Sequence, residues 1–160
     1  MSTKVSSIFD FIVEKAQAAF PEHAELRDCE DVSNNDDTVL RKGFGILPMD
    51  GENADRCLDN RRYYMKRNFE LIFTREVLAT VEDVAGRRVA YKDLLEDLDL
   101  LLQQLTPNVT IPGATTADEQ VAWDFKFLRD GGPRLISVSD KPYLFIEATL
   151  VVEYTQAITG

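Results

Sequence analysis

The segment Arg61–Leu78 (RRYYMKRNFELIFTREVL) most constrains the fold, because apolar and polar residues alternate along most of it. Successive side chains of a β-strand point to opposite faces, so this period of two predicts a strand that is buried on one face. It is much longer than a typical strand of about 5–6 residues. The alternation breaks at Arg67, where we expect a bulge or a position beyond the core. One face carries Tyr63, Met65, Phe69, Leu71, Phe73 and Val77; the other carries Lys66, Asn68, Glu70, Thr74 and Glu76.

Two segments have helical spacing instead. The first begins after Ser2 or Thr3, either of which can cap a helix, and ends at Pro21. The second lies within Val81–Leu105 and is closed by Pro107. Each predicts an amphipathic helix with one buried stripe. The stripes are Val5, Ile8, Phe9, Ile12, Ala16, Ala19 and Phe20 in the first, and Tyr91, Leu94, Leu95, Leu98, Leu101, Leu102 and Leu105 in the second.

The remaining strands are expected to be mostly short. A strand is predicted before Pro48, which we expect to break it together with the polar stretch Asp50–Asp55. Asp130-Gly131-Gly132-Pro133 predicts a turn into a short return strand, because glycine accepts positive φ. The predicted strands are Thr38–Leu47, Val121–Leu128, Leu135–Val138 and Tyr143–Tyr154; flexible loops are expected at 22–38, 48–60 and 106–120.

These elements predict a single domain over residues 1–160 of the α+β class. Two helices are too few to cover both faces of a parallel sheet. We therefore expect a mainly antiparallel sheet, with a mixed sheet left open, and two helices packed on one face.

The chain carries 28 acidic and 18 basic residues, for a formal net charge of −10. Such a surface repels phosphate, which disfavours nucleic-acid and membrane binding over most of the protein. Solubility alone can explain the charge; a surface past which DNA moves without sticking is the sharper explanation. Cys29 and Cys57 form no disulfide framework, and no signal peptide or membrane span is evident. We expect a soluble protein of a reducing cytoplasm.

No catalytic or cofactor constellation is recognisable, and we expect no enzymatic activity, cofactor or metal. His23 is the only histidine, and we expect a surface or capping role for it beside Glu22 and Glu25 rather than a metal site. Asp50–Asp55 lacks the spacing of a calcium loop, and Gly43-Phe44-Gly45 lacks the third glycine of a dinucleotide fingerprint. The acidic residues of the second helix are expected on its solvated face: Asp93, Glu96, Asp97 and Asp99.

A basic cluster near the start of the long strand is the candidate interface. Arginine and tyrosine are favoured at protein interfaces, and an acidic copy of the chain would be a complementary partner. Single-strand nucleic-acid stacking is the alternative, which the negative charge of the whole domain disfavours. The candidate subunit or tube interface is Arg56, Arg61, Arg62, Tyr64, Lys66 and Arg67.

The order of elements resembles that of the tail terminator proteins of long-tailed bacteriophages, also called tail completion or minor tail proteins. The resemblance rests on the first helix ending in Phe20-Pro21, the strand near Gly43–Ile46, the long arginine-rich strand, the helix Tyr91–Leu105, a strand into Asp130-Gly131-Gly132-Pro133 and the final strand ending at Tyr154. It covers most of the chain, but no single motif is diagnostic.

The resemblance implies a structural virion protein without catalytic residues. It implies a homo-oligomeric ring, expected to be a hexamer, that caps the tail tube at its head-proximal end. Such a ring stops polymerisation of the tail tube protein and joins the head–tail connector or neck protein. DNA would pass through the ring without specific binding, and assembly would occur in the host cytoplasm.

Other functions stay open at this point. A different tail tube or neck component would build on similar sheets. A small-ligand-binding domain could use Trp123, Phe125 and Tyr91 as a pocket, although a core role for these aromatic residues is favoured. An acidic, DNA-mimicking inhibitor of a host enzyme is the third class.

Overall fold

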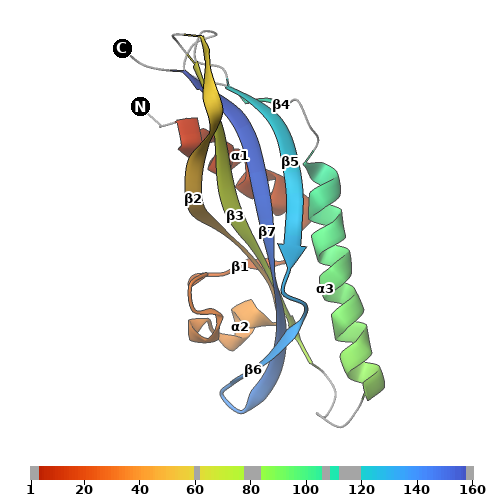
Figure 1. The fold of residues 1–160 in the computed structure, drawn as a ribbon. Helices are drawn as coiled ribbons and strands as arrows, with labels where there is room; N and C mark the ends of the chain where they lie inside the picture. The colour runs from red at the N-terminus through yellow and green to blue at the C-terminus, as the bar shows by residue number, and fades with distance from the viewer. Residues whose placement is uncertain (1–3, 60–61, 78–83, 106–108, 112–119, 158–160) are drawn as a thin grey trace.

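The computed structural model describes residues 4–59, 62–77, 84–105, 109–111 and 120–157, with side chains described for 6–52, 65–77, 84–105 and 124–154. One mostly antiparallel sheet packs against helices, which confirms the predicted α+β class (Figure 1). The elements are α1 (Lys4–Ala19), β1 (Ala24–Glu25), the 3-10 helix η1 (Val32–Asn34), α2 (Asp37–Leu40), β2 (Lys42–Asp59), β3 (Arg62–Glu76), α3 (Val84–Gln104), β4 (Val109–Ile111), β5 (Gln120–Asp130), β6 (Arg134–Val138) and β7 (Lys141–Ala157).

The strands follow the spatial order β1-β2-β3-β7-β5-β4, and β6 also pairs with β7. Only β1 is parallel to its neighbour, β2, so the sheet is mixed at that one position among the described strands. β2, β3 and β7 are 18, 15 and 17 residues long, and β3 pairs with β7 along its full length from Arg62 to Glu76. The long strands therefore form the centre of the molecule.

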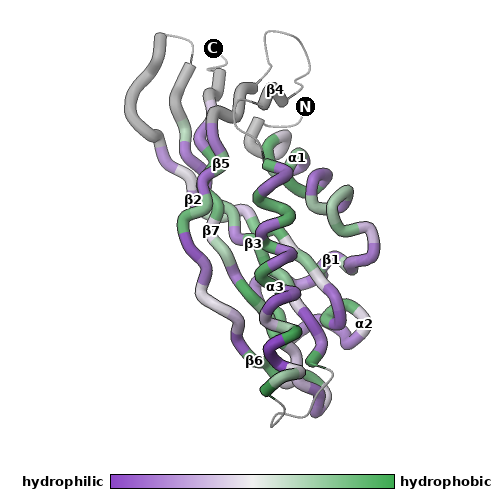
Figure 2. Tube along the Cα trace, turned by 90° about the vertical axis from the view of Figure 1, so that its right-hand side faces the viewer, coloured by the Kyte–Doolittle hydropathy of each residue, from purple (hydrophilic) through white to green (hydrophobic). Residues whose placement is uncertain are grey.

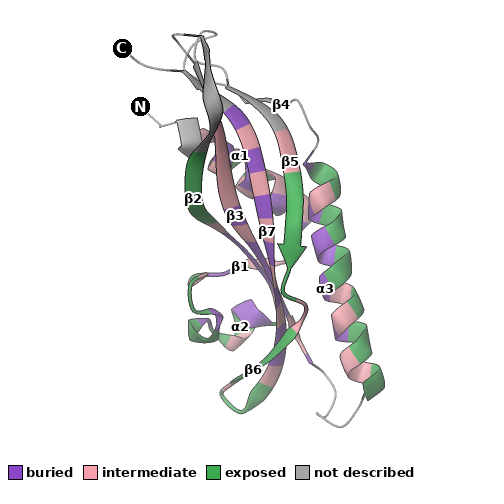
Figure 3. Cartoon of the chain, viewed as in Figure 1, coloured by how far each residue is buried: buried purple, intermediate pink, exposed green. Residues whose placement is uncertain are grey.

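The main core lies between the sheet and the two long helices. Phe69, Leu71 and Phe73 of β3 are at most 1% exposed, as the period of two predicts. Helices α1 and α3 cover this face, and Figure 3 shows the buried side of α3 turned toward the sheet. In the tube of Figure 2, apolar and polar positions alternate along α3 and the central strands. The other main contributors are Ile8, Ile12, Ala16, Leu94, Leu98, Leu101, Leu144, Ile146, Ala148, Leu150, Val152 and Tyr154.

A second, smaller core lies on the opposite face, which the sequence did not predict. Segment 22–38 was expected to be a flexible loop, yet it contains β1 and η1 and leads into α2. Its apolar side chains pack against Ile72 and Tyr143, which alternate with the main-core residues of β3 and β7. Asn35 is 3% exposed and organises the segment with four hydrogen bonds, to the backbone of Arg27, Asp28 and Val32. The second core consists of Leu26, Val32, Val39, Leu40, Ile72 and Tyr143.

The predicted break at Pro48 is wrong. Thr38 lies in α2, and β2 begins at Lys42 and continues through Pro48 and Gly51 to Asp59, so residues 48–59 are strand rather than loop. The register with β3 shifts between Pro48 and Gly51, directly opposite the place where the alternation of β3 fails. Proline and glycine are tolerated here because β2 is an edge strand with a bulge. The loop predicted at 106–120 falls mostly outside the described residues; within it, 109–111 form β4.

The strand predicted at Leu135–Val138 is present as β6, but the predicted reversal of direction at Gly131-Gly132 is wrong. Both β5 and β6 run antiparallel to β7, so the chain keeps its direction and only kinks between them. Gly132 has a φ of 73°, and its N–H donates to the Asp130 carboxylate at 2.9 Å. The hairpin turn comes later, at Ser139 and Asp140, which both have positive φ as a two-residue type I′ turn requires.

Candidate functional site

The predicted basic cluster lies toward the end of the sheet where both chain ends are found (Figure 1). Arg56 is in β2, and Arg62 and Tyr64 are in β3, opposite Ala157 and Thr155 of β7. Their side chains and all of Arg61 lie outside the described residues. An interface role for these four residues stays a prediction.

Lys66 and Arg67, the remaining two residues, lie on opposite faces of the sheet. Lys66 is on the outer face, away from α1 and α3, where its Nζ lies 3.9 Å from Glu153 Oε1. Arg67 is on the helix face, between Met65 and Phe69. The six residues therefore do not form one continuous basic patch.

Arg67 is engaged within the chain. Its Nη1 donates to the Met49 carbonyl at 2.9 Å, across the bulge of β2. Gly51 lies opposite Arg67, and a Cβ there would come within 2.5 Å of the guanidinium. The buried Tyr154 phenol is nearby: burial raises its pKa, and the Arg67 charge partly offsets that rise. The arginine that broke the alternation thus stabilises an irregular strand pairing.

A buried ionic cluster joins α3, β3 and the end of α1, and neither His23 nor Asp97 lies where the sequence analysis expected it. Asp97 is 7% exposed rather than solvated. Arg75 Nη2 donates to both Asp97 carboxylate oxygens, at 2.9 and 2.8 Å. His23 Nε2 lies 3.1 Å from Asp97 Oδ2, and its ring packs against Phe20 at 4.6 Å between centroids. The His23 side chain is only 5% exposed, so it is not a surface residue.

The sequence did contain a signal for Asp97. It falls three residues after Leu94 and four before Leu101, inside the leucine stripe rather than opposite it. Nothing near His23 in the sequence indicates its partner, which is 74 residues away. Only the tertiary fold brings the two together.

The ionic cluster has a structural rather than a catalytic arrangement. Within the described part of the chain, Asp97 is the one side-chain hydrogen-bond partner of His23, so no hydroxyl or thiol is placed as a nucleophile. Burial raises the pKa of the Cys29 thiol, and the nearby Glu25 and Asp28 carboxylates add to the effect. Cys29 is therefore disfavoured as a thiolate nucleophile at neutral pH.

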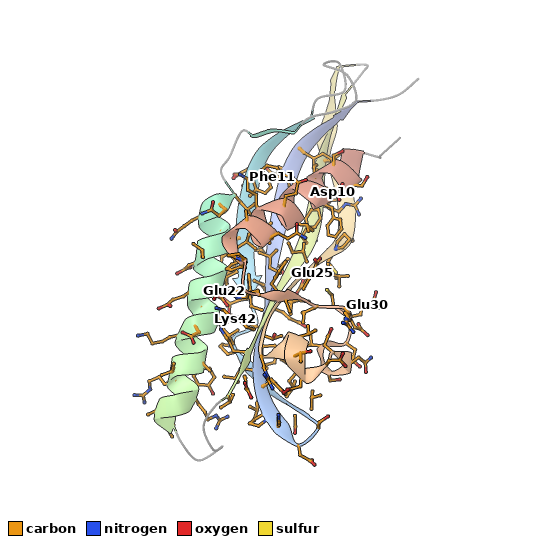
Figure 4. All side chains as sticks on the ribbon, turned by 180° about the vertical axis from the view of Figure 1, so that it is seen from behind. Asp10, Phe11, Glu22, Glu25, Glu30 and Lys42 are labelled. Atoms are coloured by element: carbon orange, nitrogen blue, oxygen red, sulfur yellow. The ribbon has the colours of Figure 1, made fainter. Side chains whose placement is uncertain are left out.

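The polar surface between α1 and β2 is held by short-range pairs. Glu22 lies beside Lys42, with 3.7 Å between Oε2 and Nζ, whereas Glu30 lies well apart from them (Figure 4). Among the described residues, no group of three or more His, Cys, Asp or Glu side chains is placed to hold a metal ion.

The two open edges of the sheet are the surfaces best suited to assembly. Beyond Glu25, β1 no longer covers β2, and β4 covers only residues 120–122 of β5. Residues 46–52 of β2 and 124–130 of β5 pair on one side only in the described part of the structure. We call these stretches the β2 edge and the β5 edge.

Apolar side chains are exposed at both edges. Phe127 and Leu128 of the β5 edge are 45% and 61% exposed, and Met49 of the β2 edge is 42% exposed. Figure 3 shows the exposed stretch of β5 beside α3. Phe125 lies on the same helix-facing side as Phe127 but is half-buried, and its ring lies 5.9 Å from that of Phe11 against the main core. The side chain of Trp123 is not among those described.

Comparison of the sequence with models of known protein families gives no match, and comparison with curated proteins gives no significant match. Within the described ranges, no helix is both long and apolar enough to cross a membrane.

Proposed function

We propose that this protein is a tail terminator of a long-tailed bacteriophage. It forms a ring, expected to be a hexamer, that caps the finished tail tube, stops its polymerisation and offers the surface to which the head–tail connector binds. It acts in the virion at the head-proximal end of the tail, after assembly in the host cytoplasm.

The observation that carries this proposal is a single sheet of very long strands in which the β2 edge and the β5 edge pair on one side only within the described part of the structure. An open edge is a template for pairing with another chain and is a liability in a protein that works alone. Two different open surfaces on one subunit favour a head-to-tail contact, which closes into a ring when the rotation between neighbours allows it.

Two further observations support an assembly role. The order of elements follows that of tail terminators, which is the resemblance drawn from the sequence. The buried titratable groups Arg75, Asp97 and His23 pair with one another, as expected of a cluster that stabilises the fold. The net charge of −10 would also let DNA move through a ring without being held.

Native mass spectrometry of the purified protein, followed by electron microscopy, tests the ring. We expect a closed oligomer, alone or on tubes, and shorter tubes when the protein is added to polymerising tail tube protein. A monomer at every concentration, together with unchanged tube lengths, would overturn the proposal.

The basic cluster provides a second test. Arg62→Glu should weaken ring or tube association while leaving the circular dichroism spectrum of the monomer unchanged. Arg88→Glu, on the exposed side of α3, is the matched control and should assemble as the parent does.

A further inference from the structure

We infer that the β5 edge of one subunit pairs with the β2 edge of the next, so that the sheets of successive copies continue into one another. This inference rests on the proposed ring and names the surfaces that close it. The occupant of each edge is a second copy of this chain.

The charges of the two edges are complementary on the same face of the sheet. The β2 edge carries Asp50 and Glu52 on the outer face, where Asp50 accepts from Asn68 at 3.1 Å and Glu52 lies opposite Lys66. The β5 edge carries Asp124, Lys126 and Arg129 on that same face, opposite Glu153, Val151 and Thr149, so its two cations outnumber its one carboxylate there. Joining the edges would therefore place two acidic side chains beside two basic ones.

Part of this charge is available to a partner. Asp50, Glu52, Lys126 and Arg129 are all exposed. Arg129 and Glu52 make no ion pair within 4 Å in the described part of the chain. Lys126 lies 4.0 Å from Asp124 Oδ2 and shares Glu153 with Lys66. Arg129 acts at longer range by lowering the pKa of Glu70, which burial otherwise raises.

The exposed apolar side chains of the two edges also favour contact between them. Phe127 and Leu128 on one edge and Met49 on the other are among the most exposed large apolar residues of the described structure. An edge-to-edge contact would remove all three from water, which is favourable by about 25 cal/mol per Å² of apolar surface buried.

The directions of the strands also allow the β5 edge to pair with the β2 edge of a second copy. β2, β3, β7 and β5 alternate in direction across the sheet, so β2 and β5 are antiparallel to each other (Figure 1). When a second copy repeats the first by rotation, its β2 meets β5 as one more antiparallel pair. Closing a sheet into a ring requires a stagger between strands. If the two paired edges are offset by two residues along the strands, Lys126 of one copy lies beside Glu52 of the next, and Arg129 lies beside Asp50.

Bulges explain how such edges avoid unselective pairing. The register shifts between Pro48 and Gly51 on β2, and between Phe127 and Arg129 on β5. A bulge bends the strand and leaves a residue unpaired, which discourages contact with a regular edge. Specificity then depends on the charges and apolar side chains that flank each bulge.

Two charge-reversal variants test the pairing. Variant A carries Lys126→Glu and Arg129→Glu, so both of its edges are acidic; variant B carries Asp50→Lys and Glu52→Lys, so both are basic. Neither should assemble alone, with self-association weakened about 100-fold or more, because like charges would face each other. An equimolar mixture should assemble again, and native mass spectrometry should find A and B in equal numbers.

The control variant carries Arg88→Glu and Lys92→Glu on exposed positions of α3, which gives the same change in net charge as variant A. It should assemble as the parent does. If variants A and B each assemble alone like the parent, the edge pairing is wrong while the ring proposal stands. If the parent itself stays monomeric with and without tubes, the ring proposal fails and the edge pairing fails with it.

Circular dichroism checks that variants A and B are folded. If either is not, the milder pair Lys126→Gln and Arg129→Gln replaces it, and self-association should fall about 10-fold. Unchanged association of this folded neutral variant would overturn the edge pairing.

Discussion

At the scale of single residues, the least expected feature is the ionic cluster in which Arg75 and His23 surround the buried Asp97. A buried carboxylate is stable only when its partners satisfy it, and Arg75 and His23 do so from two other elements. Replacing the whole cluster by apolar residues need not destabilise the protein, but removing one member leaves the others without compensation. The cluster therefore fixes how α3 sits on the sheet.

We expect Asp97→Ala to reduce the free energy of unfolding by about 3–5 kcal/mol, because it leaves a buried arginine unpaired. Urea denaturation followed by circular dichroism measures the change. Asp99→Ala, on the exposed side of the same helix, should stay within about 0.5 kcal/mol of the parent. Equal effects of the two substitutions would show that the pairing of Asp97 is not stabilising.

The contributions of Glu70 and Asp28 to the stability of the protein should change with pH in opposite directions. Burial, followed by the neighbouring Glu147, raises the pKa of Glu70 above its ordinary value of 4.5. The folded state then binds the proton more tightly, so ionisation of Glu70 costs stability above the raised pKa and costs nothing below 4.5. Glu70→Gln should raise the urea midpoint at pH 7, and the gain should vanish as the pH falls below 4.5.

Asp28→Asn should behave in the reverse way. The backbone N–H of Asp31 lowers the pKa of Asp28, with smaller contributions from Asn34 and Glu30. Its ionised form therefore stabilises the protein above 3.8, and this stabilisation is lost as the pH falls through the lowered pKa. The substitution should lower the urea midpoint at pH 7 and have no effect at the lowest pH. Parallel pH profiles for the two variants would contradict both assignments.

At the scale of elements, the small second core depends on a close approach between the segment before α2 and the strand β2. Gly43 and Gly45 allow it, because their missing side chains leave room for Leu26, Val39 and Cys29. A Cβ at Gly43 would lie 2.7 Å from the Val39 carbonyl oxygen and 2.5 Å from Thr74 Oγ1. The glycine pair that resembled a fragment of a phosphate-binding loop thus has a packing role.

Gly43→Ala should lower the free energy of unfolding by about 1–3 kcal/mol, since the backbone oxygen of Val39 cannot move aside without disturbing α2. Gly131→Ala is the control, because its nearest neighbour is the flexible end of Arg134 at 3.1 Å. It should change stability by less than about 0.5 kcal/mol. Thermal unfolding of both variants separates the two cases.

Periodicity predicted the strands and helices that follow a local sequence pattern. It failed where the structure depends on a sheet edge or on a tertiary contact. The alternation of Phe69, Leu71 and Phe73 and the leucine stripe of α3 are local patterns, so β3, β7 and both long helices were foreseen. Pro48 was misread because its tolerance depends on β2 being an edge strand, which a single segment cannot reveal. The kink at Gly131-Gly132 was misread because both β5 and β6 pair with β7, and that shared pairing cannot be seen in the turn residues themselves.

The candidate site was less predictable than the fold. The basic cluster was read as one patch from its sequence position, but consecutive residues of a strand face opposite ways, as Lys66 and Arg67 do. Edge exposure depends on which strands neighbour each other, so Lys126 and Arg129 could not be chosen from sequence. The role that we propose for them is argued from the order of strands.

At the scale of the whole molecule, assembly through the two edges would combine charge pairs with apolar contacts. Salt screens exposed charges, with a Debye length of about 8 Å at physiological ionic strength, while sulfate strengthens apolar burial. We expect sodium chloride to dissociate the oligomer gradually and sodium sulfate at equal ionic strength to dissociate it less. Analytical ultracentrifugation measures both series, and an oligomer insensitive to both salts would contradict this account.

The central position of β7 sets the order in which the protein can form. Glu70 of β3 meets Thr149 of β7 across 79 residues of chain, and β5 joins the sheet only through β7. Such non-local pairing makes folding slow and delays it until nearly all the described strands have left the ribosome. A nascent chain therefore has no sheet neighbour for β5 until β7 has been made.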